Sequence, residues 1–398
     1  MFAESASNTG LSTFQTANNW SEASLQYNNR PTLGTMVGNP APITARGWVE
    51  VDVTSVVPGP GTYAFALTTT SSTRITLTSS EGGANAPQIQ FGSPPTSSRF
   101  DITRAGNTYT ALSDLGVSYT GSLKVVGERA VADLMTAGGG TVGFAAGEYD
   151  FGQDFFKFEV VRNIAFVGAG KDATVIRNFT NAAADTEPFN FTTADNITVK
   201  DLTVQAGGSN RFTSDALDFD NGNNVTVENV KVTASRGRAI VFDGKNEIWS
   251  AEHNTVRNCE IGGAVPSDGI ELLASGNNLI EGCRITNVGG HGIQFAKAAA
   301  TADQPNKKSS ANVVRNNTID NAGQDGINLN GGDANRIEGN TITNSGDDAS
   351  GRDGVRVGTG DGASCNDTVL ETNTVTDNQA TRPSDTELRS LARCAGGR

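Results

Sequence analysis

The chain has 398 residues and carries 43 acidic against 30 basic side chains, which gives a formal net charge of −13. This charge argues against nucleic acid and anionic membranes as partners, because phosphate binding needs a surplus of Lys and Arg. No apolar run reaches the roughly 18 residues of a membrane span, and residues 1–10 lack the basic and apolar regions of a signal peptide. Asn, Thr, Gly and Val prevail over the usual helix formers, so the composition indicates an all-β protein.

The first hundred residues contain segments in which apolar and polar residues alternate with the period of a strand. These segments span residues 20–31, 48–54, 61–70 and 79–91. They predict a small β module over residues 1–98. Together they resemble the second half of a DNRLRE-type module, a β-sandwich of the carbohydrate-binding class. The first half of that module has no counterpart here, so the resemblance implies a partial, jelly-roll-like β-sandwich.

Residues 99–123 follow as an expected linker, because this neighbourhood is rich in Ser, Thr, Gly and Pro. Residues 128–150 then combine a short amphipathic stretch with a Gly-rich turn, GGGTVGF. We expect a short helix here that covers the first coil of the next domain and shields its open edge.

A repeated phrase dominates the rest of the chain. An Asn followed by alternating apolar residues recurs every 23–34 residues, at Asn163, Asn196, Asn224, Asn254, Asn278, Asn312, Asn335 and Asn366. A second family of short strands lies between these phrases, for example DALDFD at Asp215 and DGIELL at Asp268. Two short strands per repeat predict a parallel β-helix of about seven or eight coils over residues 124–380. Propeller blades would need longer repeats with four strands each.

The helical cap and these repeats resemble pectate-lyase-like right-handed β-helix proteins. The resemblance implies the right hand of the coil, which is also the general hand of parallel crossovers. Residues 381–398 break the pattern and are expected to form an irregular tail. Cys259 and Cys283 fall five residues after a repeat Asn, so we expect them in a turn ladder and not in a metal site.

Alternation in the second family of strands separates residues that face the core from residues that face outward. The first outward column is Asn190, Asp218, Val241, Glu271, Gln294, Asn328 and Arg356. The second is Thr192, Asp220, Asp243, Leu273, Ala296, Asn330 and Gly358. A third set just before the strands is Asp215, Arg238, Asp268, His291, Asp325 and Asp353. Coils stack about 4.8 Å apart, so these columns predict one continuous polar face.

Carboxylates stacked this closely repel, and each needs a cation, a hydrogen bond or a raised pKa. Asp218, Asp220, Asp243 and Glu271 are therefore the expected Ca²⁺ ligands or acid and base groups. Asp268, Asp325 and Asp353 precede Gly or the strand start in the manner of ordinary turn residues, and for these three a turn role is favoured.

Hydrolysis is one chemistry that this face predicts. An inverting glycoside hydrolase needs two carboxyl groups about 6.5–9.5 Å apart, and Asp218 and Glu271 lie two coils apart. The phrases SDALDFD, SDGIEL and GGHGI also partly resemble polygalacturonase signatures. That resemblance implies Asp215, Asp268 and His291 as the catalytic set.

Elimination is the other chemistry. The segment KSSANVVRNNTI at Lys308 resembles a stretch of alginate- and chondroitin-type β-helix lyases, which implies Lys308 as the base. Lys245 is the alternative base, and Arg238 the charge neutraliser or acid. The predicted substrate-binding residues are Asp215, Asp268, Gln294, Asn328, Arg356 and Trp249, the last as a sugar-stacking ring.

These observations predict an extracellular, monomeric carbohydrate-active enzyme that cleaves an acidic, uronate-containing polysaccharide as a lyase. Its predicted catalytic residues are Lys308, Lys245, Arg238, Asp218, Glu271 and His291, with Ca²⁺ as the expected ion. The alternatives are an inverting polygalacturonase-like hydrolase and a non-catalytic adhesive β-helix.

Overall fold

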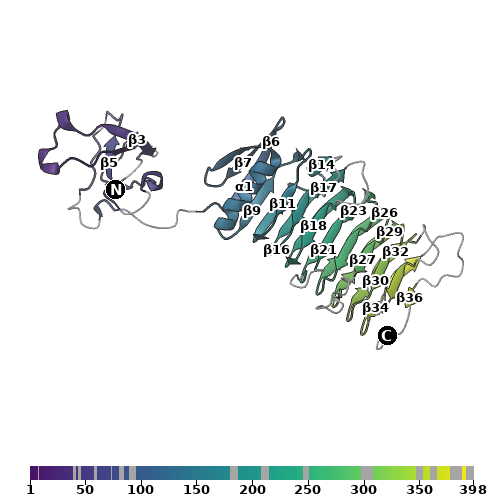
Figure 1. The fold of residues 1–398 in the computed structure, drawn as a ribbon. Helices are drawn as coiled ribbons and strands as arrows, with labels where there is room; N and C mark the ends of the chain where they lie inside the picture. The colour runs from purple at the N-terminus through teal and green to yellow at the C-terminus, as the bar shows by residue number, and fades with distance from the viewer. Residues whose placement is uncertain are drawn as a thin grey trace. The chain divides into compact units, whose positions relative to one another are not determined.

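The computed structural model describes most of the chain as two compact units, Met1–Pro94 and Pro95–Arg398 (Figure 1). The residues described are all except 8, 39–41, 44–45, 58–60, 73, 80–84, 89–95, 180–186, 208–214, 245–250, 297–307, 347–352, 359–364, 377–387 and 391–398. None of the described helices is long and apolar enough to cross a membrane.

The first unit is a small β module. Strands β2 (Ser12–Thr16), β3 (Leu33–Gly38) and β5 (Ala64–Thr68) form an antiparallel sheet in the order β3-β2-β5. Strand β1 (Phe2–Ala3) pairs with β4 (Gly47–Trp48). A small core of Ala3, Leu11, Ile43 and Val49 holds the module together. The predicted β character of this region is confirmed, and β5 confirms the strand expected within residues 61–70.

The strand expected at residues 20–31 is wrong. This segment forms two short 3-10 turns, η1 (Glu22–Ser24) and η2 (Tyr27–Asn29). The backbone N–H of Gln26 donates to Asn29 Oδ1 at 2.5 Å, and Asn29 Nδ2 donates to the Ser24 carbonyl at 2.8 Å. Such local side-chain bonds compete with strand pairing, and alternation alone did not reveal them. The segment at 48–54 likewise holds only the end of β4 and the start of η3 (Thr54–Val56), and 79–91 lies largely outside the described residues.

The expected linker at 99–123 is also wrong, because these residues belong to the second unit. Strands β6 (Arg99–Ala105), β7 (Thr108–Ser113) and β8 (Ser118–Gly121) form a meander, and β6 pairs in parallel with β9 (Gly140–Phe144). Within β6, Phe100 and Ile102 are fully buried while the residues between them face out. Thr103, Thr108, Ser118 and Thr120 occupy exposed strand positions, whereas Ser113 is buried at the end of β7.

Helix α1 (Leu123–Thr136) confirms the expected helical cap (Figure 1). Its N-cap is Ser122, whose side chain accepts from the Val125 N–H. One face of the helix is buried against the first strands, through Leu123, Val126, Ala130 and Leu134 among others.

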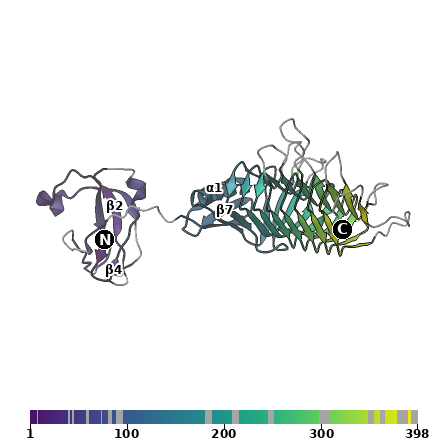
Figure 2. The same ribbon diagram turned by 90° about the horizontal axis from the view of Figure 1, so that it is seen from below.

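The remainder of the second unit is a parallel β-helix whose strands stack in rows (Figure 2). The row that carries the predicted polar face is a nine-stranded parallel sheet, called the site sheet below. Its strands are β11 (Phe156–Phe158), β15 (Phe189–Phe191), β18 (Leu217–Asp220), β21 (Ile240–Asp243), β24 (Ile270–Leu273), β27 (Ile293–Ala296), β30 (Ile327–Asn330), β33 (Val355–Gly358) and β36 (Leu388–Ser390). Strand β36 pairs with β33, so the coil pattern continues into the segment that was expected to be an irregular tail.

The repeat-Asn phrases, together with segments before and between them, form strands of the other large sheet. These are β10 (Gly147–Asp150), β13 (Ile164–Val167), β14 (Thr174–Phe179), β17 (Thr198–Gly207), β20 (Thr226–Ala234), β22 (Thr255–Arg257), β23 (Glu260–Ala264), β25 (Leu279–Glu281), β26 (Arg284–Val288), β28 (Val313–Arg315), β29 (Thr318–Ala322), β31 (Arg336–Glu338), β32 (Thr341–Thr343), β34 (Val369–Glu371) and β35 (Thr374–Thr376). A third small sheet contains β12 (Val161–Arg162), β16 (Ala194–Asp195) and β19 (Gly222–Asn223).

The core of the β-helix is formed by the inward residues that alternation predicted. Phe219 stacks on Phe191 at a ring-centroid distance of 4.9 Å and on Phe242 at 5.2 Å. The turns are held by ladders of buried side chains, as when Asn278 N–H donates to Asn312 Oδ1 at 2.9 Å. Cys283 joins such a ladder through its N–H, which donates to Asn317 Oδ1 at 2.8 Å. Cys259 and Cys283 are free and buried, which agrees with their expected place in the turns.

Candidate active site on the outer face of the β-helix

The register of the site sheet brings the first outward column together as the sequence predicted. Asp218 is in register with Val241, and Val241 with Glu271. Glu271 is in register with Gln294, which is followed by Asn328 and Arg356 in the next strands. The second column is confirmed where Asp220 lies beside Asp243 and Asp243 beside Leu273. In a parallel sheet whose strands keep the same register, equivalent residues of successive coils lie side by side, and this aligns each column.

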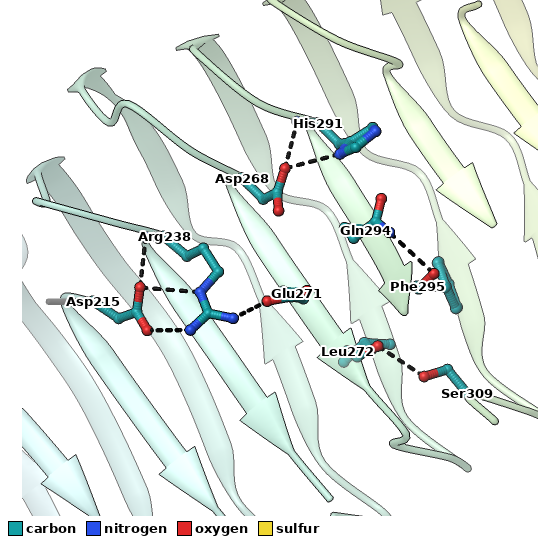
Figure 3. A network of polar contacts seen from close by, with 9 residues as sticks. All are labelled: Asp215, Arg238, Asp268, Glu271, Leu272, His291, Gln294, Phe295 and Ser309. Atoms are coloured by element: carbon teal, nitrogen blue, oxygen red, sulfur yellow. Dashed lines mark hydrogen bonds and ion pairs between the residues drawn. The ribbon is translucent and has the colours of Figure 1, made fainter. Parts of the chain in front are cut away.

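Arg238 connects two carboxylates of this face (Figure 3). Its Nε donates to Asp215 Oδ1 at 3.1 Å and its NH2 to Asp215 Oδ2 at 2.8 Å, while its NH1 donates to Glu271 Oε2. Asp215 is 6% exposed. A guanidinium matches this two-point geometry better than an ammonium would. Burial lowers the pKa of Arg238, but the two carboxylates outweigh it and raise the pKa above its usual value.

His291 occupies the corresponding position two coils further on. Its Nδ1 lies 2.9 Å from Asp268 Oδ1, and its Nε2 lies 3.3 Å from Asp325 Oδ2 and 3.0 Å from Asn328 Nδ2. Burial lowers the pKa of His291, yet hydrogen bonds to Asp268 and Asp325 outweigh that effect and raise the pKa above its ordinary value. A protonated ring donates to both carboxylates, whereas a neutral ring with its proton on Nδ1 accepts from Asn328 through Nε2.

The aspartates of the third set also hold the coils together. Asp215 Oδ1 accepts the backbone N–H of Arg238 at 2.6 Å, and Asp268 Oδ1 accepts that of His291 at 2.6 Å. Asp325 Oδ1 accepts the N–H of Asp353 at 2.7 Å in the same way. Asp268 and Asp325 thus each contact the next coil through Oδ1, and Asp325 Oδ2 also lies 3.3 Å from His291 Nε2.

Asp218 and Glu271 have unlike environments. Burial and the nearby carboxylates of Asp220, Asp215 and Glu187 raise the pKa of Asp218 well above its usual range. Burial also raises the pKa of Glu271, but there the Arg238 guanidinium opposes the shift. The fold therefore favours the protonated form of Asp218 more strongly than the protonated form of Glu271.

Sequence reasoning missed Glu187, which is 4% exposed and accepts from Asn190 Nδ2 at 3.1 Å. It lies two residues before strand β15, as Asp215 lies two residues before β18. Extending the third set by one coil toward the N-terminus would have found it.

Lys308 is not brought to this cluster. Its Nζ lies 3.5 Å from Asp333 Oδ2, and it directly precedes Ser309, whose Oγ donates to the Leu272 carbonyl at 2.7 Å. Figure 3 shows Ser309 beyond the C-terminal ends of the strands of the site sheet, whereas Asp268 and His291 lie at their N-terminal ends. The predicted residues Lys245 and Trp249 lie outside the described residues.

The four predicted Ca²⁺ ligands do not form a metal site in the described part of the chain. Asp220 and Asp243 share one column, Asp218 and Glu271 share the other with Val241 between them, and Glu271 is ion-paired to Arg238. No group of three Asp, Glu, His or Cys residues among those described could hold a metal ion. These side chains do not fit the expected ion, and no step below depends on it.

Comparisons with solved structures return β-helix proteins. The A-module of the Azotobacter vinelandii mannuronan C-5 epimerase AlgE6 is 18% identical, with 65% of this chain and 83% of that chain covered and a TM-score of 0.42. The alginate lyase from Paenibacillus sp. str. FPU-7 is 14% identical, with 63% and 94% covered and a TM-score of 0.41. The catalytic domain of a GH87 α-1,3-glucanase in complex with nigerose is 15% identical, with 94% and 66% covered and a TM-score of 0.45.

No curated protein matches the chain. Two family models do match, one within each unit. The match in the first unit is to a carbohydrate-binding module, as the sequence predicted, but the DNRLRE type is not confirmed. Residues 2–92 match carbohydrate-binding module family 96, and residues 188–380 match the right-handed β-helix region.

Proposed function

We propose that the chain is an extracellular carbohydrate-active enzyme that hydrolyses glycosidic bonds of a polysaccharide on the outer face of the site sheet. The observation that carries this proposal is the pairing of two carboxyl groups in one outward column, Asp218 and Glu271, whose environments differ. Pairs of carboxyl groups with separated pKa values are the usual acid and base of glycoside cleavage. The carbohydrate-binding module match at residues 2–92 supports a polysaccharide as the partner.

Asp218 is the proposed general acid. It is partly exposed, so a glycosidic oxygen can reach it, and burial and the neighbouring carboxylates raise its pKa and so favour the protonated form. Protonation of the leaving oxygen is the step that such a carboxylic acid performs.

Glu271 is the proposed general base. The Arg238 ion pair stabilises its ionised form against the effect of burial. Two strand spacings, about 9.6 Å, separate the backbones of Asp218 and Glu271. The carboxyl groups of inverting enzymes lie about 6.5–9.5 Å apart, a separation close to this backbone spacing. A water molecule between the carboxylate and the sugar is then the nucleophile.

Elimination has less support from the described residues. The guanidinium of Arg238 is bound by two carboxylates that raise its pKa, so it is a poor base. Lys308 is ion-paired with Asp333, and neither residue contacts the carboxylates of the site in the described part of the chain. The lyase hypothesis would therefore rest on Lys245, which lies outside the described residues.

The test is a screen of neutral and acidic polysaccharides with the whole chain, in which reducing ends and ultraviolet absorbance are followed in parallel. Hydrolysis predicts reducing ends without the absorbance of a new double bond. Asp218→Asn and Glu271→Gln should each lower kcat by about a hundredfold or more. Asp320→Asn, on strand β29 of the other sheet, is the matched control and should keep full activity.

Two results would contradict the proposal. Unsaturated products would show that the enzyme cleaves by elimination. Full activity of Asp218→Asn would show that Asp218 is not the general acid. Binding without any cleavage would leave the adhesive alternative.

A further inference from the structure

Gln294 has a buried oxygen atom without a hydrogen-bond donor. The residue is 8% exposed, and no described group donates to its Oε1. A buried amide oxygen that makes no hydrogen bond destabilises the fold, because it has lost its contact with water without gaining a donor. Such an atom beside a proposed active site indicates a place for a ligand group.

The orientation of the Gln294 amide follows from its other contact. Nε2 donates to the Phe295 carbonyl at 3.3 Å. The reverse orientation would set two oxygen atoms against each other, so the amide oxygen points away from that carbonyl. Figure 3 shows the amide oxygen of Gln294 directed toward the N-terminal ends of the strands, where Asp268 and His291 lie.

Two further oxygen acceptors flank Gln294. Glu271, its register neighbour, uses Oε2 for Arg238, and no described donor contacts its Oε1. Asp268 uses Oδ1 for His291, and no described donor contacts its Oδ2. These three oxygens, from Asp268, Glu271 and Gln294, are called the acceptor set below.

The charge around the acceptor set is negative. Arg238 is bound by Asp215 and Glu271, and His291 by Asp268 and Asp325. Even with His291 protonated, these described side chains carry two cations against four carboxylates. A uronate carboxylate here would meet acceptors and negative charge, whereas a sugar hydroxyl supplies the missing donor.

We propose that the acceptor set binds a neutral sugar unit of the polysaccharide, with one hydroxyl donating to Gln294 Oε1 and a neighbouring hydroxyl to Asp268 Oδ2, which leaves Glu271 Oε1 for the attacking water. This inference rests on the proposed function and names its substrate class. It replaces the uronate expected from the sequence.

The test compares the whole chain with Gln294→Met, which keeps the side-chain length and removes the amide. Gln205→Met is the matched control, because Gln205 donates to Thr233 on the other sheet at 2.9 Å. Binding to neutral and uronate polysaccharides is measured by affinity electrophoresis, and KM on any polysaccharide that is cleaved. The first unit is unchanged in all three proteins, so a difference between them reports on the β-helix.

We expect Gln294→Met to weaken binding or raise KM for a neutral polysaccharide by about three- to tenfold, the effect of one lost hydrogen bond. Gln205→Met should match the wild type. Cleavage of a polysaccharide with an unchanged KM in Gln294→Met would overturn this inference and leave the proposed function standing. Loss of binding to uronates alone would also overturn it.

The two proposals can fail separately. Weaker binding of a neutral polysaccharide by Gln294→Met, in a protein that cleaves nothing, would refute hydrolysis and support the acceptor set. Equal binding by all three proteins together with no cleavage would refute both.

Discussion

Asp215 and Arg238 form a two-point ion pair across adjacent coils, and Asp215 Oδ1 also accepts the backbone N–H of Arg238 at 2.6 Å. One aspartate thus fixes both the chain and the side chain of the residue above it. The same guanidinium reaches Glu271 in the following coil, so a single cation joins three coils.

Arg238→Met should therefore destabilise the β-helix. It leaves Asp215 and Glu271 without their cation, and breaking a buried pair costs about 3–5 kcal/mol. The Arg238 side chain is 31% exposed, so we expect the lower end, about 3 kcal/mol. Urea unfolding of the whole chain measures this change.

Arg315→Met provides the comparison for that experiment. Arg315 pairs with Glu281 at 2.8 Å, and the Glu281 side chain is 32% exposed, against 8% and 12% for the carboxylates that hold Arg238, so the loss of the Arg315 pair should cost less than about 1 kcal/mol. Equal effects of the two variants would contradict a structural role for the Arg238 ion pairs.

His291 should make stability depend on pH. Its pKa is raised above the ordinary 6.5 by Asp268 and Asp325, after burial has acted in the opposite direction. The folded protein therefore binds the proton more tightly than the unfolded chain. This stabilisation is complete below the unfolded pKa and is lost as pH rises through the folded pKa.

The measurement is the free energy of unfolding at several pH values for the wild type and His291→Gln. The difference between them should be largest in mildly acidic solution and shrink above pH 6.5. Parallel curves for the two proteins would show that the ring does not titrate between these carboxylates.

Asp218→Asn should stabilise the protein while it removes activity. The pKa of this carboxyl is raised by burial and by neighbouring carboxylates, so its ionised form is unfavourable in the fold. The amide avoids that charge, so the gain should grow as pH rises from the unfolded pKa through the folded pKa and level off above it. Thermal unfolding near neutral and mildly alkaline pH tests this. A lower Tm for Asp218→Asn would indicate that the carboxylate is stabilised in the fold.

Asn312 should be a sensitive position of the turn ladder. Its Oδ1 accepts from Asn278 N–H and its Nδ2 donates to the Ser275 carbonyl, at 2.9 and 3.0 Å. Asn312→Ala leaves these buried groups unpaired, at a cost of about 2–3 kcal/mol. Asn366→Ala, an exposed repeat Asn, should change the free energy of unfolding by less than about 0.5 kcal/mol. A similar loss in both variants would refute the ladder's contribution.

The architecture and the order of the polar columns could be predicted from the sequence. Strand alternation with period two assigns each residue to a face, and the repeat sets the coil to which it belongs. Parallel stacking then brings Asp218, Glu271, Gln294 and Asn328 into one column without further information. The inward aromatic residues, such as Phe219, followed from the same rule.

Pairing across the columns depended on the tertiary structure. The rotamers of Arg238 and His291 decide that each lies between two carboxylates, and the turn paths decide that Lys308 meets Asp333 instead of the site. Periodicity carries no information about side-chain direction beyond inward or outward. The turns at residues 20–31 depend on local side-chain hydrogen bonds that alternation does not report. The strands within residues 99–121 do alternate, but their Ser, Thr and Gly content indicated a linker instead. Repetition in the sequence determined which residues share a face, and hydrogen bonding in three dimensions decided which of them act together.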